Sequence, residues 1–444
     1  MNDALTSART PRTPWRNWAH TVEARPTHVV TPGSPEDVAE VLVRAAERGL
    51  RVKAVGAGHS FTPVAATDGV QVRLDRLRGV GPVKPDDAGG ALVTVGAGTP
   101  LHVVNDELAA RGYGLTNMGD IAAQTVAGAI GTGTHGTGRD SAGLAAQVAA
   151  AQVVLPDGSI VDASPGHDPE LFAAARLSLG AVGIITAVTL RVEPSFVLHA
   201  VEERSTLDDV LDRFDDLAGE EHCEFYWVPF TDAVQLKRNR RTDAPPRPLG
   251  RFRSWWEGDV LENGGVALAQ RITRAAPRST PAVNHLVARF IGRREYSDAA
   301  PAVFTSVRRV RFHEMEYALP RSVAVAALRA FRQLTARGPW RVAFPVEVRM
   351  APADDVWLST AHGRDTVYVA THAYPRTDYR GWFDAVEELW TAYGGRPHWG
   401  KLHTRDAAYL EAACPRFGDF GRVRDRADPS RVLTNRYLQQ VLGD

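Results

Sequence analysis

The stretch that decides the fold of this chain is Arg51-Val52-Lys53-Ala54-Val55-Gly56-Ala57-Gly58-His59-Ser60-Phe61. Its first half predicts a brief strand that ends in the β-branched Val55, whereas Gly56 and Gly58 permit a positive φ or a close approach of the backbone. A loop of this kind turns successive N–H groups toward a pyrophosphate and leaves His59 at its rim. The alternative is a tight surface turn with an incidental histidine, because the spacing matches neither the three-glycine dinucleotide fingerprint nor a P-loop.

A helix is predicted directly before this strand. Ser34 suits the N-cap, Pro35 suits the first helical position, and Glu36 and Asp37 place negative charge in the first turn. Apolar residues then recur at helical spacing until Gly49, which ends the helix. The segment therefore has the order of a β-α-β unit.

A second glycine-rich segment lies at residues 128–138, Gly-Ala-Ile-Gly-Thr-Gly-Thr-His-Gly-Thr-Gly. Its five glycines and three threonines predict neither a helix nor an ordinary central strand. A flexible linker is the alternative, but linkers favour serine and lack apolar flanks such as Ile121, Val126 and Ile130. We therefore expect a second backbone cradle here.

Composition limits the class of protein. A chain of 444 residues is long for one core, so two domains are expected. Lys+Arg 52 and Asp+Glu 52 give a formal net charge of +0, which argues against nucleic acid as a partner. Two cysteines, Cys223 and Cys414, make no disulfide framework and fit a reduced cytoplasmic protein. The polar N-terminus lacks the apolar core of a signal peptide, and no run reaches the ~20 apolar residues of a membrane span.

Four motifs occur along the chain in one order: residues 55–60, Asn117-Met118-Gly119-Asp120, residues 131–138 and His398-Trp399-Gly400-Lys401. In this order they resemble the aldonolactone oxidoreductases. These are flavoproteins of the vanillyl-alcohol oxidase type and include gulonolactone oxidase, arabinonolactone oxidase and the related alditol oxidases. The resemblance runs from about residue 21 to the C-terminus and implies an FAD-dependent enzyme that acts on CH–OH groups. The residues alone indicate only a nucleotide-binding α/β protein.

The resemblance and the changes in sequence character divide the chain into four parts. We expect a flexible N-terminus at 1–20, an FAD-binding α+β domain at 21–194, a substrate cap at 195–395 and a C-terminal segment at 396–444 that returns to the FAD domain. Asp157-Gly158 between two β-rich runs predicts a hairpin in the FAD domain. Strands separated by helices predict an antiparallel sheet with covering helices in the cap. The expected fold class is α+β, the two-domain vanillyl-alcohol oxidase type.

The resemblance also implies which residues bind FAD. His59 matches the histidine that the family bonds covalently to the 8α carbon of the flavin, and the alternative is a loop histidine that only forms hydrogen bonds. His135 is a rival for that bond, with an expected structural or cofactor-contact role. No metal is expected. The expected cofactor-binding residues are Val55, Gly56, Ala57, Gly58, His59, Ser60, Gly119, Asp120, Gly128, Thr132, Gly133, Thr134, His135, Gly136, Gly183, Ile185 and Asn435.

Four residues are expected to carry the chemistry. Residues 346–350 alternate strictly, so Glu347 and Arg349 point from one face of a strand, which either meets water or lines a cavity. Relatives have a Glu-x-Arg here, with the arginine placed to stabilise negative charge near flavin N1. His372 and Lys401 match residues opposite the reactive N5, where a neutral imidazole suits a general base and a lysine binds the substrate oxygen. Which of these two removes the proton stays open.

Gly119 and Asp120 bear on the electron acceptor. Gly119 matches a position beside flavin C4a where glycine leaves a path for dioxygen, which favours an oxidase. Asp120 replaces the serine of the alditol oxidases, and Met-Gly-Asp-Ile resembles the bacterial gulonolactone dehydrogenase branch. We expect oxidation of a gulono-, galactono- or arabinono-1,4-lactone by hydride transfer to flavin N5, with oxygen or another acceptor. The alternatives are an alditol (polyol) oxidase and a non-catalytic flavin- or sugar-binding protein.

Overall fold

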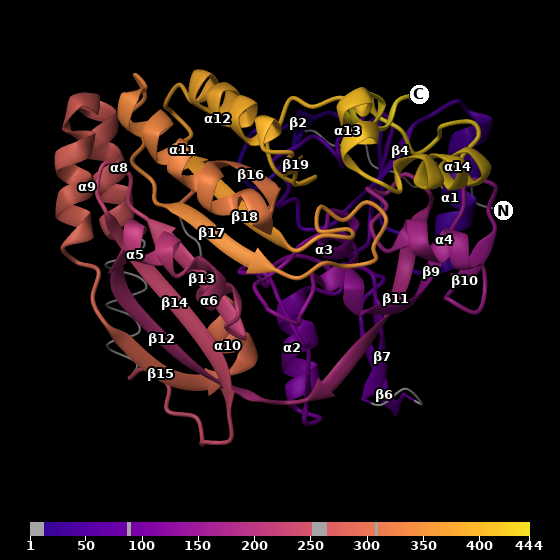
Figure 1. The fold of residues 1–444 in the computed structure, drawn as a ribbon. Helices are drawn as coiled ribbons and strands as arrows, with labels where there is room; N and C mark the ends of the chain where they lie inside the picture. Colours follow the sequence, from indigo (N-terminus) through magenta and orange to yellow (C-terminus); the bar gives the residue numbers. More distant parts are fainter. Residues whose placement is uncertain (1–12, 87–89, 251–263, 307–309) are drawn as a thin grey trace.

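The computed structural model describes residues 13–86, 90–250, 264–306 and 310–444. These residues build two units that lie side by side, and the first strands and the last helices of the described chain belong to the same unit (Figure 1). One hydrophobic cluster lies mainly in the first unit, although Leu198 and Phe304 of the second unit join it, and another lies within the second unit. The first cluster also takes in Trp399 and apolar residues between 410 and 441, so the end of the chain packs with its beginning.

The first unit contains a three-stranded parallel sheet and a larger antiparallel sheet. The parallel sheet has the order β3-β5-β4, and the larger sheet has the order β10-β9-β11-β7-β6 with β8 paired to β11. A short pair, β1-β2, stands apart from both sheets. The strands of the first unit are β1 (Trp15–Arg16), β2 (Glu23–Ala24), β3 (His28–Val30), β4 (Val52–Val55), β5 (Val70–Arg73), β6 (Val80–Pro85), β7 (Ala91–Gly96), β8 (Tyr113–Gly114), β9 (Val148–Val154), β10 (Ile160–Ala163) and β11 (Ile184–Pro194). Its helices are α1 (Pro35–Glu47), α2 (Leu101–Ala109), α3 (Val126–Gly131), η1 (Leu144–Gln147), α4 (Pro169–Ala175), α13 (Ala407–Ala413), α14 (Phe417–Ala427) and α15 (Arg436–Leu442).

Helix α1 forms as its sequence predicts. Ser34 Oγ accepts a hydrogen bond of 3.1 Å from the Asp37 amide, and Pro35 occupies the first helical position. Gly49 ends the helix with a φ of 63°, in the left-handed region that glycine tolerates best. The hairpin between β9 and β10 is also confirmed, with Gly158 at a φ of 89° in its turn.

Two expectations about this unit are wrong. The glycine density of residues 128–138 predicts no helix, yet Val126–Gly131 forms helix α3. Val126, Ala129 and Ile130 are fully buried, so tertiary packing outweighs the poor helix propensity of glycine. The expected flexible N-terminus extends to residue 20, but Trp15–Arg16 pairs with Glu23–Ala24; residues 1–12 lie outside the described part of the chain.

The second unit is an eight-stranded antiparallel sheet of order β15-β12-β14-β13-β17-β18-β16-β19. Its strands are β12 (Val197–Thr206), β13 (His222–Trp227), β14 (Ala233–Thr242), β15 (Arg294–Ala299), β16 (His313–Pro320), β17 (Val346–Ala351), β18 (Thr366–Ala373) and β19 (Arg396–Pro397). Its helices are α5 (Leu207–Asp212), α6 (Phe214–Ala218), α8 (Val266–Ala275), η3 (Pro277–Ser279), α9 (Thr280–Ala288), α10 (Ala300–Phe304), η4 (Arg321–Val323), α11 (Ala324–Arg337) and α12 (Arg380–Ala392).

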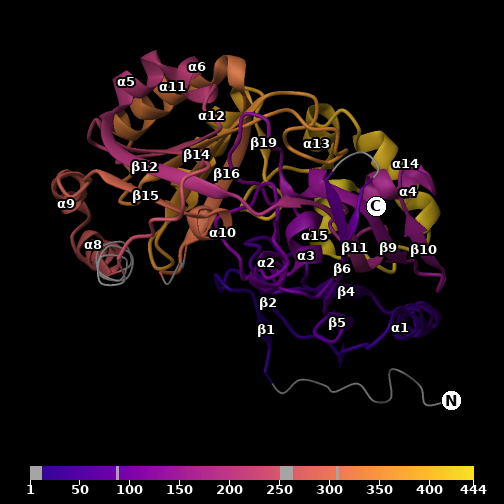
Figure 2. The same ribbon diagram turned by 90° about the horizontal axis from the view of Figure 1, so that it is seen from below.

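The two faces of this sheet differ in chemistry. One face packs under α5, α6, α11 and α12, and inward residues such as Phe225 and Val348 join Phe331 and Trp390 of the helices in the second hydrophobic cluster (Figure 2). Because side chains alternate along a strand, the residues between them point to the opposite face. That opposite face carries charged residues, and it roofs a cavity that the glycine loops of the first unit close from the other side.

Candidate active site

The first of two adjoining cavities is lined by both glycine-rich segments, and we call it the cradle. It has a volume of about 120 Å³ and shares His59, Ser60, Gln124 and Thr132 with its neighbour. Glycine is required at its walls: a Cβ on Gly56 would overlap Thr125 Oγ1, and one on Gly183 would overlap Val153. The cradle therefore brings bare backbone close to whatever fills it, as a phosphate-bearing cofactor needs.

Most of the expected cofactor residues line one of the two cavities, and four do not. Val55 is buried in β4, Gly133 packs against Leu177, and a Cβ on Gly136 would overlap the Met118 carbonyl. Asn435 caps α15 and donates to the carbonyls of residues 63, 64 and 66, so it holds a loop instead of facing the cradle. The expected residues in the cradle are Gly56, Ala57, Gly58, His59, Ser60, Gly128, Thr132, Gly183 and Ile185, and those in the second cavity include Gly119, Asp120, Thr134 and His135.

Lys53 is a cradle residue that the sequence analysis missed. Its side chain is 2% exposed and its ammonium donates to the carbonyls of Leu179, Gly180 and Leu433 at 3.1–3.2 Å. Burial, helped by nearby Arg424, lowers the pKa of Lys53 to about 7. Through these hydrogen bonds Lys53, in the strand that leads into the first glycine loop, is connected to residues 179–180 and to the C-terminal segment within the cradle wall.

His59 stands where the two cavities meet. Its Nδ1 is buried and has no hydrogen-bond partner among the described residues, and its ring stacks on Trp18 with the centroids 5.7 Å apart. Burial and the charge of Lys401 lower the pKa of His59, so the imidazole is neutral at neutral pH. A neutral ring with an unused nitrogen at this junction fits attachment of a cofactor.

The second cavity is the larger one, with a volume of about 310 Å³. On one side of it Glu314, Lys401 and His372 form a cluster. Lys401 Nζ lies 2.5 Å from Glu314 Oε2, and His372 Nε2 lies 3.7 Å from Glu314 Oε1. Burial disfavours the charged lysine, but Glu314 and Glu316 outweigh it and raise the pKa of Lys401. Glu314 was not expected from the sequence; it stands directly opposite His372 in the ladder between β16 and β18.

A second charged cluster surrounds Arg349 on the same sheet face. Arg349 forms an ion pair with Glu347 on its own strand, and its Nε donates to Glu224 Oε2 on β13 at 2.9 Å. Lys237 on β14 completes the cluster 3.1 Å from Glu224 Oε1. Burial disfavours the charge of Arg349, but Glu347 and Glu224 raise its pKa well above the ordinary value. Glu347 and Arg349 therefore line the cavity, and the alternative of a surface position is wrong.

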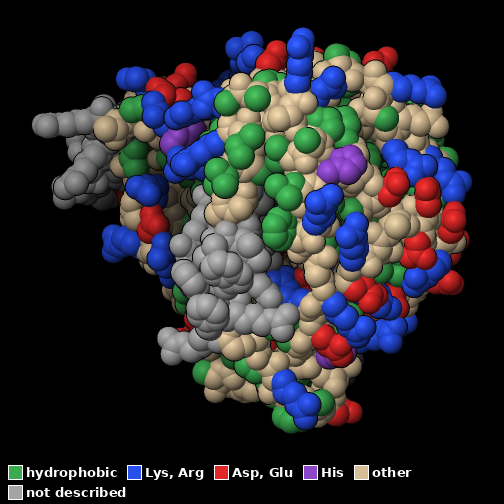
Figure 3. Space-filling model, turned by 90° about the vertical axis from the view of Figure 1, so that its left-hand side faces the viewer, with side chains coloured by type: hydrophobic (Ala, Val, Ile, Leu, Met, Phe, Trp, Pro, Cys, Tyr) green, Lys and Arg blue, Asp and Glu red, His purple; other side chains and the backbone are tan. Residues whose placement is uncertain are grey.

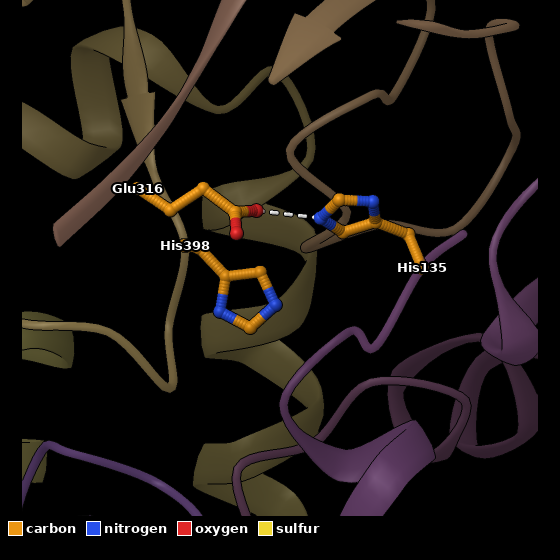
Figure 4. A group of neighbouring side chains, drawn as sticks. All are labelled: His135, Glu316 and His398. Atoms are coloured by element: carbon orange, nitrogen blue, oxygen red, sulfur yellow. Dashed lines mark hydrogen bonds and ion pairs between the residues drawn. The ribbon is translucent and has the colours of Figure 1, made fainter. Parts of the chain in front are cut away.

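Three further side chains meet between the units: His135, Glu316 and His398 (Figure 4). Glu316 Oε1 lies 2.5 Å from His135 Nε2, while His135 Nδ1 faces the Gly136 carbonyl at 3.1 Å. His398 Nδ1 accepts from the Gly400 amide, and burial lowers the pKa of His398 to about 4. Potential metal-ligating atoms of the three lie within 4.8 Å of one another, but these hydrogen bonds already use several of them. Both ring nitrogens of His135 are engaged, so His135 does not compete with His59 for attachment.

Gly119 has a packing role that its sequence does not reveal. A Cβ at this position would lie 2.7 Å from Thr134 Cγ2 and 3.1 Å from the His135 carbonyl oxygen. The space next to Gly119 is thus filled by the second glycine loop, and the glycine alone gives no evidence of an oxygen path. Asp120 accepts a hydrogen bond of 2.6 Å from Ser306 Oγ, and its negative charge contributes to raising the pKa of Arg349.

The fold and the site define a class. A backbone cradle that opens into a charged chamber, roofed by the sheet of a second unit, is the architecture of a two-domain flavoenzyme of the vanillyl-alcohol oxidase type. The solved structures that match are consistent with this fold. A cholesterol oxidase from Brevibacterium sterolicum superposes with a TM-score of 0.83 at 17% identity, covering 98% of each chain. A solvent-stable cholesterol oxidase gives 0.82 at 18% identity, covering 100% of this chain and 99% of that one.

Sequence comparison identifies the family. The profile of an FAD binding domain matches residues 26–164, and that of D-arabinono-1,4-lactone oxidase matches residues 188–441. The chain is 40% identical to an L-gulono-1,4-lactone dehydrogenase of Mycobacterium tuberculosis, over 97% of this chain and 99% of that protein. It is 33% identical to the L-gulonolactone oxidase of Bos taurus, over 96% and 98%. The chain belongs to the aldonolactone oxidoreductase family and is an FAD-dependent oxidoreductase. Among its described helices, none has the length and apolar character to cross a membrane.

Proposed function

We propose that this protein oxidises a hydroxyl of a sugar-derived 1,4-lactone of the gulono-, galactono- or arabinono-type. The names of its relatives support a lactone substrate. The observation that carries the proposal is the cluster in which Glu314 holds Lys401 and His372 at the wall of the cavity next to the cradle. Oxidation of an alcohol needs one group to bind its oxygen and another to take its proton, and this cluster offers both.

We assign the base to His372. Lys401 is held protonated by Glu314, so its ammonium donates a hydrogen bond and cannot accept the proton. It binds the substrate hydroxyl oxygen and stabilises the negative charge that develops there. His372 takes the hydroxyl proton on an imidazole nitrogen as the carbon gives up its hydride. Glu314 is a positioning residue because it acts through both neighbours.

FAD supplies the hydride acceptor when it is bound. Residues of the cradle fit its phosphate-bearing part, and His59 fits a covalent bond to its ring through the buried Nδ1. Arg349, fixed by Glu347 and Glu224, places a positive charge in the chamber and offsets the negative charge that arrives with the hydride. Oxygen and other oxidants both stay candidates for the final acceptor.

The proposed function is tested by anaerobic bleaching of the purified yellow protein. We expect gulono-, galactono- or arabinono-1,4-lactone to bleach the flavin, and Lys401→Met to slow bleaching roughly 100-fold or more. Lys84→Met, a matched change at an exposed lysine of β6, should bleach at the wild-type rate. Bleaching by alditols and not by lactones would favour a polyol oxidase instead. A yellow protein that neither class bleaches would be a non-catalytic binder, and the proposal would be wrong.

A further inference from the structure

Helices α8 and α9 expose apolar side chains to solvent and bury polar ones. Leu268 and Ile272 of α8 are 59% and 43% exposed, while polar Gln270 and Thr273 of the same helix are buried. The second helix repeats the pattern: it buries Thr280 and Asn284 and exposes Leu286 at 53%, and Phe290 just after its end is 69% exposed. A surface helix normally turns its apolar stripe toward the core. We call Leu268, Ile272, Leu286 and Phe290 the α8–α9 face.

The charge of this segment is as unusual as its exposure. Residues 264–293 contain five arginines and no aspartate or glutamate, in a chain whose positive and negative charges are equal in number overall. Four of the arginines are exposed and form no ion pair with a carboxylate of the described chain. These are Arg271, Arg274, Arg278 and Arg289. The segment is therefore both amphipathic and basic.

The segment stands at the outer edge of the sheet unit, away from the first unit (Figures 1 and 2). Figure 3 views this side of the molecule and shows apolar side chains gathered there with basic side chains around them. We propose that the α8–α9 face docks the protein onto a membrane surface that contains anionic lipid. The apolar side chains would enter the headgroup region, and the arginines would pair with lipid phosphates.

The charge of the segment favours an anionic membrane surface over a second copy of the chain as the partner of the α8–α9 face. Pairing two α8–α9 faces would bring two arginine-rich segments together without an intervening carboxylate from either, which opposes association. The apolar residues also project from helices, so they suit a fluid surface that conforms around them. An anionic bilayer satisfies both the charge and the shape.

Vesicle sedimentation tests the proposal with the full-length holoprotein. We expect binding to vesicles of phosphatidylcholine with phosphatidylglycerol, weak binding to phosphatidylcholine alone, and loss of binding at high salt. Leu286→Ser with Phe290→Ser should weaken binding at least about tenfold. Each of Arg271→Gln and Arg274→Gln should weaken it roughly fivefold. Ile160→Ser and Arg436→Gln, exposed residues elsewhere on the molecule, serve as matched controls.

Flavin content and lactone bleaching should not change in these variants, because the face lies outside both cavities. This keeps the result independent of the proposed reaction. The proposal is overturned if wild-type protein fails to bind anionic vesicles at low salt, or if the α8–α9 variants bind as well as the controls. A wild-type dimer in sedimentation velocity that Leu286→Ser with Phe290→Ser makes monomeric would also overturn it, in favour of a second copy.

Discussion

The sharpest test of the site is replacement of Arg349, because the structure predicts two separable effects. Arg349 lies between Glu347 and Glu224, with its side chain only 13% exposed. Replacing it with Met leaves two buried carboxylates short of a cation, although Glu224 keeps Lys237 at 3.1 Å. Removing one partner of a buried ion pair costs about 3–5 kcal/mol of folding stability. Loss of one charge that stabilises a developing anion costs roughly 3–4 kcal/mol of barrier, or about 100- to 1,000-fold in rate.

A second substitution separates the two effects. Arg349→Met with Glu347→Gln removes a positive and a negative charge together, so it should recover part of the lost stability. It should not recover the rate, because the positive charge in the chamber is still absent. Arg349→Lys keeps the charge and should lie between wild type and Arg349→Met in both respects.

Urea unfolding of the holoprotein measures the stability of each variant, and anaerobic stopped-flow measures flavin reduction by a lactone. Coupling in the double variant is read from a double-mutant cycle. The reasoning is refuted if Arg349→Met is reduced within about threefold of wild type, which is far less than the expected loss. It is also refuted if the double variant regains both stability and rate, since Arg349 would then serve only the fold.

Three further predictions follow from the site. His59→Ala should release all flavin into the supernatant after acid precipitation, whereas wild type should keep it in the pellet; free flavin from wild type would refute the tether. Gly119→Ala should slow both flavin reduction and reoxidation in stopped-flow, because the new methyl meets Thr134 at 2.7 Å; an effect on reoxidation alone would restore the oxygen-path explanation. Burial lowers the pKa of His398 to about 4 from an ordinary value of about 6.5, so the unfolded chain binds more protons between these pH values and stability falls as the pH drops through that window. We expect this group to cost about 2 kcal/mol by pH 5, and His398→Asn, which keeps an acceptor for the Gly400 amide, to reduce that loss in urea unfolding at pH 7 and pH 5; an unchanged loss would contradict it.

Local features of the fold could be predicted from the sequence because short-range chemistry determines them. The cap of α1, the turn at Gly158 and the shared face of Glu347 and Arg349 each depend on a few neighbouring residues. Helix α3 could not be predicted, since burial of its apolar side chains overrides the glycine content. Burial is a property of the whole fold.

Glu314 and Glu224 were missed for a similar reason. Each reaches the site through a cross-strand register, Glu314 opposite His372 and Glu224 opposite Arg349, and the sequence does not show which strands pair. The sequence did contain one signal for the site, in the lysines that pair with these two glutamates. The chain has four lysines against 48 arginines, and three of those lysines, Lys53, Lys237 and Lys401, line the two cavities. Lys84 is exposed, but at the other three positions the chain uses a compact ammonium where it otherwise uses arginine.

The balance of charge in the chamber bears on the kind of molecule it receives. Its lining includes five carboxylates, from Asp120, Glu202, Glu314, Glu316 and Glu347, and four cations, from Lys237, Arg294, Arg349 and Lys401. Several of these groups are paired with one another, so their positions are fixed before a substrate enters. A wall of paired charges offers many hydrogen-bond donors and acceptors but no surplus of positive charge. It therefore suits a neutral polyhydroxylated ring better than the anionic aldonate that hydrolysis of a lactone produces, which is the selectivity that a lactone-oxidising enzyme needs.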